Sequence, residues 1–359
     1  MSRDAAGVGA RVFRQDVQGM HAYAVQPSAG MIKLDAMENP HRLAPQLQAE
    51  LGRRLGALAL NRYPGERVDA LRDALASHAQ MPRGFEIMLG NGSDELISLV
   101  ALACDVPGAS ILAPVPGFVM YAMSAQLQGL KFTGVPLTAD FELDEAAMLS
   151  AIAEHRPSVI YLAYPNNPTA NLWDDAVIEK VIEAAPGLVV IDEAYQPFSS
   201  KSYLGRMARH GHVLLMRTLS KFGLAGARIG YMMGPAALIA QIDKVRPPYN
   251  VSVLNCEAAL FALEHAGVYA AQAADLCRQR AALGRALAEL PGVKAWPSDA
   301  NMILVRVPDA QKAFDRMKSL GVLVKNVSKM HELLANCLRI TVGTADENAR
   351  MLAALEASL

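Results

Sequence analysis

One lysine past the middle of the chain stands among residues that suit chemistry on an anionic ligand. Lys221 lies in the stretch Arg217-Thr-Leu-Ser-Lys-Phe-Gly-Leu-Ala-Gly-Ala-Arg228, between the hydroxyl residues Thr218 and Ser220 and the later Arg228. A lysine that reacts covalently needs a fixed position and a lowered pKa. A lysine able to form a Schiff base beside a phosphate site is what pyridoxal phosphate requires. Taken alone, the stretch fits a surface loop equally well.

Three other polar motifs follow segments that are predicted to be strands. They are Gly90-Asn-Gly-Ser-Asp-Glu95, Asn166-Asn-Pro-Thr169 and Asp192-Glu-Ala-Tyr195. Ligands of open parallel sheets bind beyond the carboxyl ends of the strands, so these motifs are expected to meet at one edge. Each has a plain alternative, namely a capped turn, a common Asn-Pro turn and a capping aspartate.

The first motif suits a phosphate, because glycines let the backbone approach an anion and the N–H groups of a helix start can hold it. Ser93 and Asp94 would supply those N–H groups. The motif does not match a dinucleotide fingerprint, since Glu95 stands where a third glycine is needed. This mismatch counts against a nucleotide-binding dehydrogenase.

The other two motifs suit a planar, protonated ring. Asp192 follows the apolar strand 188–191, and a buried carboxylate there needs a cationic partner such as a pyridinium nitrogen. Tyr195 and the amide of Asn167 would donate to a ring oxygen. Phe118, just past two prolines, would stack on the ring, although a core aromatic is the alternative.

Composition excludes several other classes of function. The 359 residues are 52% hydrophobic, with a net charge of −1 and four widely spaced cysteines. No nucleic-acid surface, disulfide framework or metal site is expected from these features. No apolar run approaches the length of a membrane span, and we expect a cytoplasmic enzyme without a membrane partner.

The alternation of predicted strands and helices from about residue 60 to 240 indicates an α/β fold with a mostly parallel sheet between helices. A long helical stretch, 255–290, and three further strands indicate a smaller α+β domain at the C-terminus. We expect an N-terminal arm, 1–35, that joins the small domain, then a large domain, 36–250, and the small domain, 251–359.

These motifs together resemble the fold-type I, class II pyridoxal-phosphate aminotransferases, and among them the histidinol-phosphate aminotransferases. The resemblance covers nearly the whole chain. Besides the motifs above it is carried by Lys33-Leu-Asp-Ala-Met-Glu-Asn-Pro40, Asn61-Arg-Tyr-Pro64 and Leu334-Ala-Asn-Cys-Leu-Arg-Ile-Thr-Val-Gly343. It implies a seven-stranded sheet in the large domain, pyridoxal 5′-phosphate as cofactor, and a homodimer with shared active sites.

The resemblance also implies a role for each matching residue. Lys221 would hold the cofactor covalently, Asp192 would pair with the ring nitrogen, and Tyr195 and Asn167 with the ring oxygen. The phosphate would be held by Ser93, Asp94, Thr218, Ser220 and Arg228, and by Tyr63 from the other subunit, with Phe118 on the ring. Substrate would be bound by Tyr23, Asn39, Lys325 and Arg339. Two positions depart from the family pattern: Lys325, where some members have arginine, and Ala170, usually glycine.

The implied reaction is the transfer of an amino group between histidinol phosphate and 2-oxoglutarate, with glutamate and imidazole acetol phosphate on the other side, in L-histidine biosynthesis. Alternatives on the same fold are an aromatic-amino-acid aminotransferase and a decarboxylase of phosphothreonine type. A non-catalytic regulatory module is a further alternative. It is disfavoured because no helix-turn-helix pattern precedes the region that resembles the aminotransferases.

Overall fold

The computed structural model describes residues 5–20 and 26–359, and the chain divides into two units, Met1–Gly30 and Met31–Leu359. The described part of the first unit holds two short helices, α1 (Ala5–Val12) and α2 (Gln15–Gln18). Arg14, which precedes α2, forms an ion pair of 2.5 Å with Asp16 in its first turn. The predicted arm residue Tyr23 lies outside the described residues.

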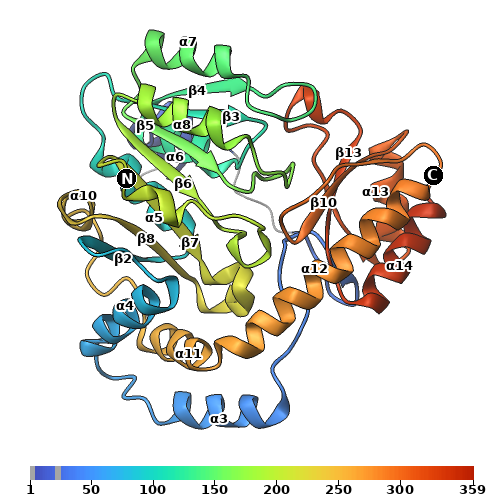
Figure 1. Ribbon diagram of the computed structural model, residues 1–359, viewed down its shortest axis with the longest axis horizontal. Helices are drawn as coiled ribbons and strands as arrows, with labels where there is room; N and C mark the ends of the chain where they lie inside the picture. The colour runs from blue at the N-terminus through green and yellow to red at the C-terminus, as the bar shows by residue number, and fades with distance from the viewer. Residues whose placement is uncertain (1–4, 21–25) are drawn as a thin grey trace. The chain divides into compact units, whose positions relative to one another are not determined.

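Within the described residues of the second unit, seven strands form the large sheet in the order β2-β8-β7-β6-β5-β3-β4. Only β8 runs antiparallel to its neighbours. The predicted α/β fold with a mostly parallel, seven-stranded sheet is therefore confirmed (Figure 1). The strands are β2 (Phe85–Asn91), β3 (Ser110–Val115), β4 (Lys131–Pro136), β5 (Val159–Ala163), β6 (Leu188–Asp192), β7 (Val213–Thr218) and β8 (Ile229–Pro235).

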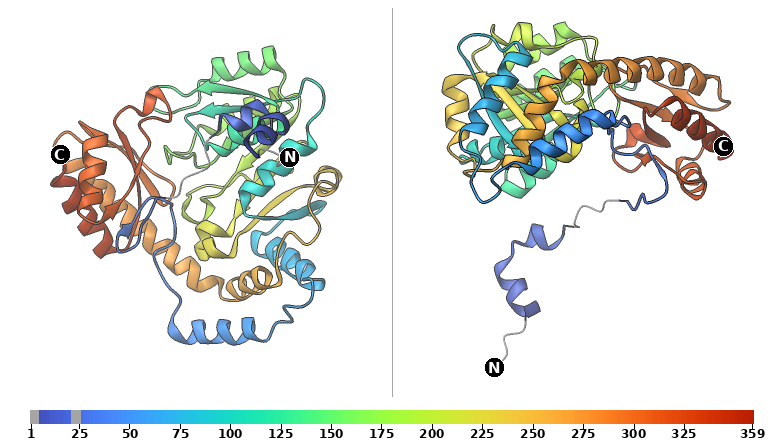
Figure 2. Two further views of the ribbon diagram at one scale, coloured as in Figure 1. Left: turned by 180° about the vertical axis from the view of Figure 1, so that it is seen from behind. Right: turned by 90° about the horizontal axis from the view of Figure 1, so that it is seen from below.

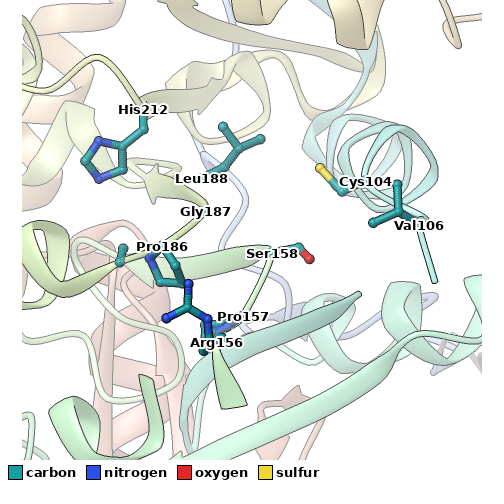
Figure 3. Close-up of a pocket in the computed structure, with 10 residues that line it drawn as sticks. Cys104, Val106, Arg156, Pro157, Ser158, Pro186, Gly187, Leu188 and His212 are labelled. Atoms are coloured by element: carbon teal, nitrogen blue, oxygen red, sulfur yellow. The ribbon is translucent and has the colours of Figure 1, made fainter. Parts of the chain in front are cut away.

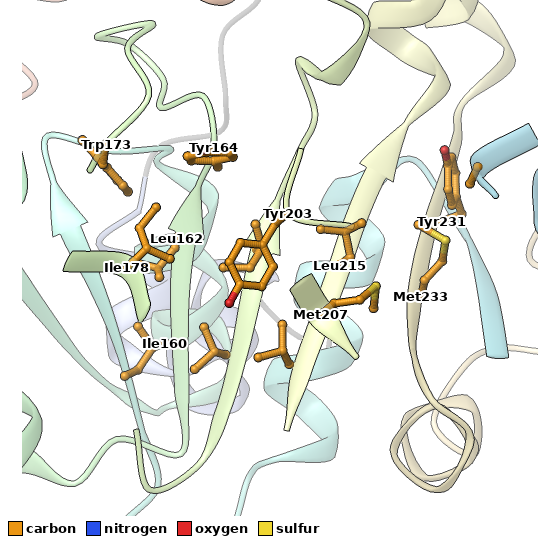
Figure 4. Close-up of a cluster of buried hydrophobic side chains, with 14 of the residues drawn as sticks. Ile160, Leu162, Tyr164, Trp173, Ile178, Tyr203, Met207, Leu215, Tyr231 and Met233 are labelled. Carbon is orange, nitrogen blue, oxygen red and sulfur yellow. The ribbon is translucent and has the colours of Figure 1, made fainter. Parts of the chain in front are cut away.

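Helices cover both faces of this sheet because the central strands are apolar at successive positions along most of their length. Ile160 and Leu162 of β5 pack into one core, shown in Figure 4, whereas Val159 and Tyr161 between them pack into the core on the opposite face. This alternation is the period of a strand that is buried on both sides. The covering helices are α4 (Glu66–Ala79), α5 (Ser93–Ala103), α6 (Met120–Gln128), α7 (Glu145–His155), α8 (Asp175–Ala184), α9 (Leu204–Met207) and α10 (Ala236–Asp243).

The long helical stretch predicted for residues 255–290 is divided at His265. Helix α11 (Val253–Glu264) packs against α4 and α3 (Pro45–Gly56), and α12 (Ala266–Glu289) leads away from them toward the C-terminal strands (Figure 2). The break separates a helix that packs on the large-sheet side from a helix that packs against the strands of the smaller sheet. No helix among the described residues combines the length and apolarity needed to cross a membrane.

The C-terminal part contains a second, antiparallel sheet within the described residues, in the order β12-β13-β10-β9. A separate parallel pair joins β1 (Ile32–Lys33), near the start of this unit, to β11 (Val322–Leu323). The elements are β9 (Lys294–Ala295), β10 (Met302–Arg306), β12 (Lys325–Asn326), β13 (Cys337–Thr341), α13 (Ala310–Ser319) and α14 (Ala345–Glu356), which begins with a capping box of Thr344 and Glu347.

Candidate active site

Lys221 lies just beyond the carboxyl end of β7, in the short helical turn η2 (Ser220–Leu224). Its Nζ donates to the carbonyl oxygen of Ala36 at 3.0 Å. Burial, and next the positive charge of Arg339, lower the pKa of Lys221 to about 8. Both causes disfavour the ammonium form, so near neutral pH the amine is far easier to deprotonate than that of an ordinary lysine.

Asp192 ends β6, the strand next to β7, and is 4% exposed. Oδ2 accepts from the hydroxyl of Tyr121 at 2.7 Å, and Oδ1 accepts from the backbone N–H of Ala194 at 3.0 Å. Burial raises the pKa of Asp192 to about 6, although both hydrogen bonds act in the opposite direction. Because these two partners are neutral, a cation brought to this carboxylate would relieve its desolvation.

Tyr121 is a member of the site that sequence reasoning missed. It lies on α6 three residues after Phe118, stacks on Tyr161 with ring centroids 4.4 Å apart, and meets Phe118 edge to face at 5.6 Å. Burial, and next the charge of Asp192, raise the pKa of Tyr121, so its hydroxyl stays protonated and donates. The available signal was the run Phe118-Val-Met-Tyr121, in which a second aromatic residue follows Phe118 at helical spacing.

Tyr195 and Asn167 lie on the side of the site that faces the C-terminal sheet. Tyr195 is buried, and this burial raises its pKa while the charge of Arg339 acts against the rise. Oδ1 of Asn167 accepts from Nη1 of Arg339 at 2.7 Å. That bond orients the amide, so the NH₂ group of Asn167 is the end that can donate to a ligand.

The turn between β2 and α5 forms a cradle together with the segment that follows β7. Gly92 has φ 84°, and a Cβ there would lie 2.4 Å from Nη2 of Arg228. Likewise, a Cβ on Gly230 would lie 2.6 Å from the N atom of Ser93. Glycine at both positions is what lets the start of α5 and Arg228 approach one another.

Polar groups from three segments line this cradle. Nη2 of Arg228 lies 3.7 Å from Oδ2 of Asp94, and its Nη1 donates to the hydroxyl of Ser220 at 3.5 Å. Thr218 Oγ1 donates to Ser220 Oγ at 3.0 Å. With the N–H groups at the start of α5, these donors suit an oxyanion such as a phosphate.

The predicted substrate cations lie opposite each other in the C-terminal sheet. Lys325 of β12 is the register partner of Arg339 of β13, so the two side chains start from the same face. Arg339 is 8% exposed, and its Nη2 donates to the carbonyl oxygen of Asp35 at 2.7 Å. Two acceptors therefore hold its guanidinium toward Asn167 and the segment 35–36.

Asn39 lies close to the lysine segment, but its amide has partners in this chain. Its Nδ2 donates to Oε1 of Gln272 at 2.9 Å, and its Oδ1 accepts from the backbone N–H of His41 at 2.9 Å. A Cβ at Gly223, which has φ 136°, would lie 3.0 Å from the same Nδ2. Asn39 therefore packs beside the turn that carries Lys221.

Tyr63 is not brought to the other predicted site residues by any described contact. It is 74% exposed and stacks on Tyr249, with ring centroids 4.2 Å apart and planes 12° apart. Arg228, Lys221 and Asp192, by contrast, are gathered at the carboxyl ends of neighbouring strands. Tyr63 thus makes no described contact with the site of its own chain.

A surface hollow of about 690 Å³ lies at the other ends of the central strands (Figure 3). It is lined by Ser158, which precedes β5, by Leu188, which begins β6, and by His212, which precedes β7. None of the predicted site residues lines it. The candidate site is the polar cluster around Lys221.

Comparison with known proteins agrees with this geometry. The family described as aminotransferase class I and II matches residues 29–355. The chain belongs to this family. An aminotransferase of this family uses pyridoxal phosphate, so the expected cofactor and enzyme class are confirmed, as is the resemblance to the histidinol-phosphate aminotransferases.

Two curated aminotransferases are similar over almost their whole length. The histidinol-phosphate aminotransferase of Polaromonas naphthalenivorans (strain CJ2) is 77% identical, over 97% of this chain and 96% of that protein. The one from Methylibium petroleiphilum (strain ATCC BAA-1232 / LMG 22953 / PM1) is 71% identical, over 98% and 95%. The crystal structure of histidinol-phosphate aminotransferase from Sinorhizobium meliloti in complex with pyridoxal-5′-phosphate has a TM-score of 0.85, 25% identity and 97% coverage of both chains.

The residues present fit this cofactor by their own chemistry. Asp192 offers a buried carboxylate to a protonated ring nitrogen, the cradle at Gly92 and Gly230 offers donors to a phosphate, and Lys221 offers an amine of lowered pKa. These three requirements are chemically independent. They meet at one edge of the aminotransferase sheet.

The lowered pKa of Lys221 predicts its reactivity in the cofactor-free chain. Only the neutral amine is a nucleophile, so acetylation of Lys221 should rise with pH around a midpoint near 8 instead of 10.5. The Arg339→Gln substitution should shift this midpoint upward, because it removes a positive charge. Mass spectrometry of the labelled peptides measures both, with the exposed Lys131 as internal reference. A midpoint near 10.5 would contradict the assignment.

The raised pKa of Asp192 predicts how the stability of the cofactor-free chain depends on pH. The folded state binds this proton more tightly than the unfolded state, where the pKa is near 3.8, so stability is lost as pH rises through about 6. Between pH 5 and 8 the wild type should lose about 1.4 kcal/mol of unfolding free energy relative to Asp192→Asn. Urea titrations at fixed protein concentration measure this difference. The exposed control Asp105→Asn should follow the wild type, and a difference that does not vary with pH would refute the prediction.

Proposed function

We propose that this aminotransferase interconverts histidinol phosphate plus 2-oxoglutarate with imidazole acetol phosphate plus glutamate, in L-histidine biosynthesis. The observation that carries the proposal is the 77% identity, over 97% of the chain, to a curated histidinol-phosphate aminotransferase. Differences in substrate class are uncommon at this level of similarity, because most site residues are then shared. The paired cations Lys325 and Arg339 support an acidic substrate.

We propose a role for each cofactor-binding residue. Asp192 would pair with the ring nitrogen, Tyr195 and Asn167 with the ring oxygen, and Phe118 would lie against the ring. The phosphate would be held by Ser93, Asp94, Thr218, Ser220 and Arg228 of the cradle. When bound, pyridoxal phosphate supplies an electron sink for the electrons left at the substrate Cα.

Lys221 is proposed to move the proton. As a neutral amine, its Nζ would take a proton from the substrate Cα when an amino group is removed. It would give a proton back to Cα when an amino group is added. A pKa near 8 is suitable for this role. The carbonyl oxygen of Ala36 can hold Nζ when it carries the extra proton. The charge of Arg339 opposes that protonated state, which favours return of the proton.

Arg339 and Lys325 are proposed to bind the acidic group of each substrate in turn. Arg339 offers a guanidinium fixed by Asn167 and Asp35, whereas Lys325 offers a point charge from the neighbouring strand. Asn39 would border the substrate beside the lysine turn.

We further propose a homodimer in which Tyr63 reaches the cofactor phosphate of the partner subunit. The support is that Tyr63 is 74% exposed, is stacked on a half-exposed Tyr249, and lines a surface hollow together with Leu58 and Val253. Exposed aromatic pairs of this kind are enriched at protein interfaces. Four free cysteines support a reducing, cytoplasmic location.

The proposed domains are an arm, 1–35, a large domain, 36–250, and a small domain, 251–359. Pairing of β1 with β11 supports an arm that joins the small domain. Helix α11 lies beyond residue 250 and packs against α3 and α4. Through this contact, α11 packs against helices of the proposed large domain.

The substrate assignment is tested by steady-state kinetics of the purified enzyme with 2-oxoglutarate. Turnover should be much faster with histidinol phosphate than with phenylalanine. The Lys325→Gln substitution should lower kcat/KM for histidinol phosphate about 10- to 100-fold, which corresponds to one lost charge-assisted hydrogen bond. Lys325→Arg, which keeps the charge, is the matched control. Preference for phenylalanine would instead support an aromatic-amino-acid aminotransferase.

The shared site is tested by mixing two defective variants, Lys221→Ala and Tyr63→Ala. If Tyr63 serves the partner subunit, each mixed dimer has one site with both residues intact and one with neither. Random exchange of subunits should then restore about a quarter of wild-type activity, since half of the dimers are mixed. Activity equal to the average of the two separate variants would show that the sites are not shared.

A further inference from the structure

Tyr63 lies in the loop of residues 57–65, and the ion pairs that connect this loop to α11 are at its two ends. The loop connects α3 to α4, and its backbone hydrogen bonds in the described structure are local, as in Leu60 to Leu58 and Arg62 to Ala59. The loop borders a hollow of about 330 Å³. Pro64 is buried, whereas Tyr63 itself is exposed and its described ring contact is the stack on Tyr249.

Both ends of the loop meet a single carboxylate on α11. Glu257 is 5% exposed, and its Oε2 pairs with Nη1 of Arg67 in the first turn of α4. Its Oε1 lies 3.7 Å from Nη1 of Arg54 in the last turn of α3. One oxygen thus faces the segment before the loop, and the other faces the segment after it.

Arg54 also has partners in this cluster other than Glu257. Nη2 of Arg54 pairs with Glu264 at 2.7 Å and with Glu50 at 3.1 Å, and its guanidinium lies 5.0 Å over the ring of Phe261. Among the residues that the structure describes, Glu50 and Glu264 form their ion pairs with Arg54 and not with Arg67. Glu257 is the acidic residue of the cluster that touches both stems of the loop.

We propose that Glu257 is a positioning residue for the active site of the partner subunit. By bridging Arg54 and Arg67 it sets the separation of the loop ends, and so fixes the direction in which Tyr63 leaves the surface. A buried carboxylate with one partner would be a poor source of stability, whereas one that joins two segments orders the loop between them. This inference rests on the proposed role of Tyr63 at the partner's cofactor phosphate.

The test uses the full-length dimer and the substitution Glu257→Gln, which keeps the volume and removes the charge. Amide hydrogen exchange of residues 57–65 should become at least tenfold faster, with or without pyridoxal phosphate. The matched control is Glu264→Gln, which removes a partner of Arg54 but leaves the bridge, and its loop should exchange as in the wild type. Unchanged exchange in Glu257→Gln would overturn the proposal. If this variant does not fold, Arg67→Gln breaks the same bridge from its more exposed side.

A double-mutant cycle then links the bridge to the cofactor. Reconstitution titrations should show that Glu257→Gln and Tyr63→Phe each weaken pyridoxal phosphate binding about tenfold, and that combining them adds little. Multiplied effects in the double variant would overturn the positioning role. If Tyr63→Phe alone leaves binding unchanged, the proposed shared site fails first and the positioning role fails with it. If only Glu257→Gln leaves it unchanged, the shared site stands and the bridge is structural.

Discussion

The buried carboxylate of Asp192 is the constraint on which the site depends. It lies at the end of a central strand with a tyrosine hydroxyl and a backbone N–H as partners, and its pKa is raised to about 6. On the next strand, the same burial lowers the pKa of Lys221 to about 8. Without the cofactor, burial thus shifts both groups toward their neutral forms, and a cofactor with a cationic ring nitrogen would stabilise the charged carboxylate.

Arg339 connects that chemistry to the C-terminal sheet. Its guanidinium touches Asn167, which follows a strand of the large sheet, and Asp35, which precedes the carbonyl that holds Lys221. A substrate acid that binds Arg339 therefore meets residues from both sheets. Its charge also lowers the pKa of Lys221, so binding of an anion there would favour protonation of the lysine. In the proposed mechanism, substrate recognition and proton transfer would be electrostatically linked through Arg339.

Much of this arrangement could be predicted from local patterns. Lys221, Asp192 and the Gly90–Glu95 turn all follow apolar runs, and parallel strands bring such positions to one edge. Tyr121 was missed because its helix has the pattern of an ordinary covering helix, and only the packing of α6 on the sheet brings its hydroxyl to Asp192. The acceptor for Lys221 is a backbone carbonyl, Ala36, which no side-chain motif identifies.

The sequence by itself determined the α/β order of elements, the reactive residue types and the glycines at the cradle, because each of these is encoded within a few neighbouring residues. Only the tertiary structure decided that Lys325 lies opposite Arg339, that Tyr63 faces outward, and that Glu257 bridges Arg54 and Arg67. The reason is physical: strand register and helix packing depend on the summed burial of many side chains from distant segments. No short stretch of this chain contains that information.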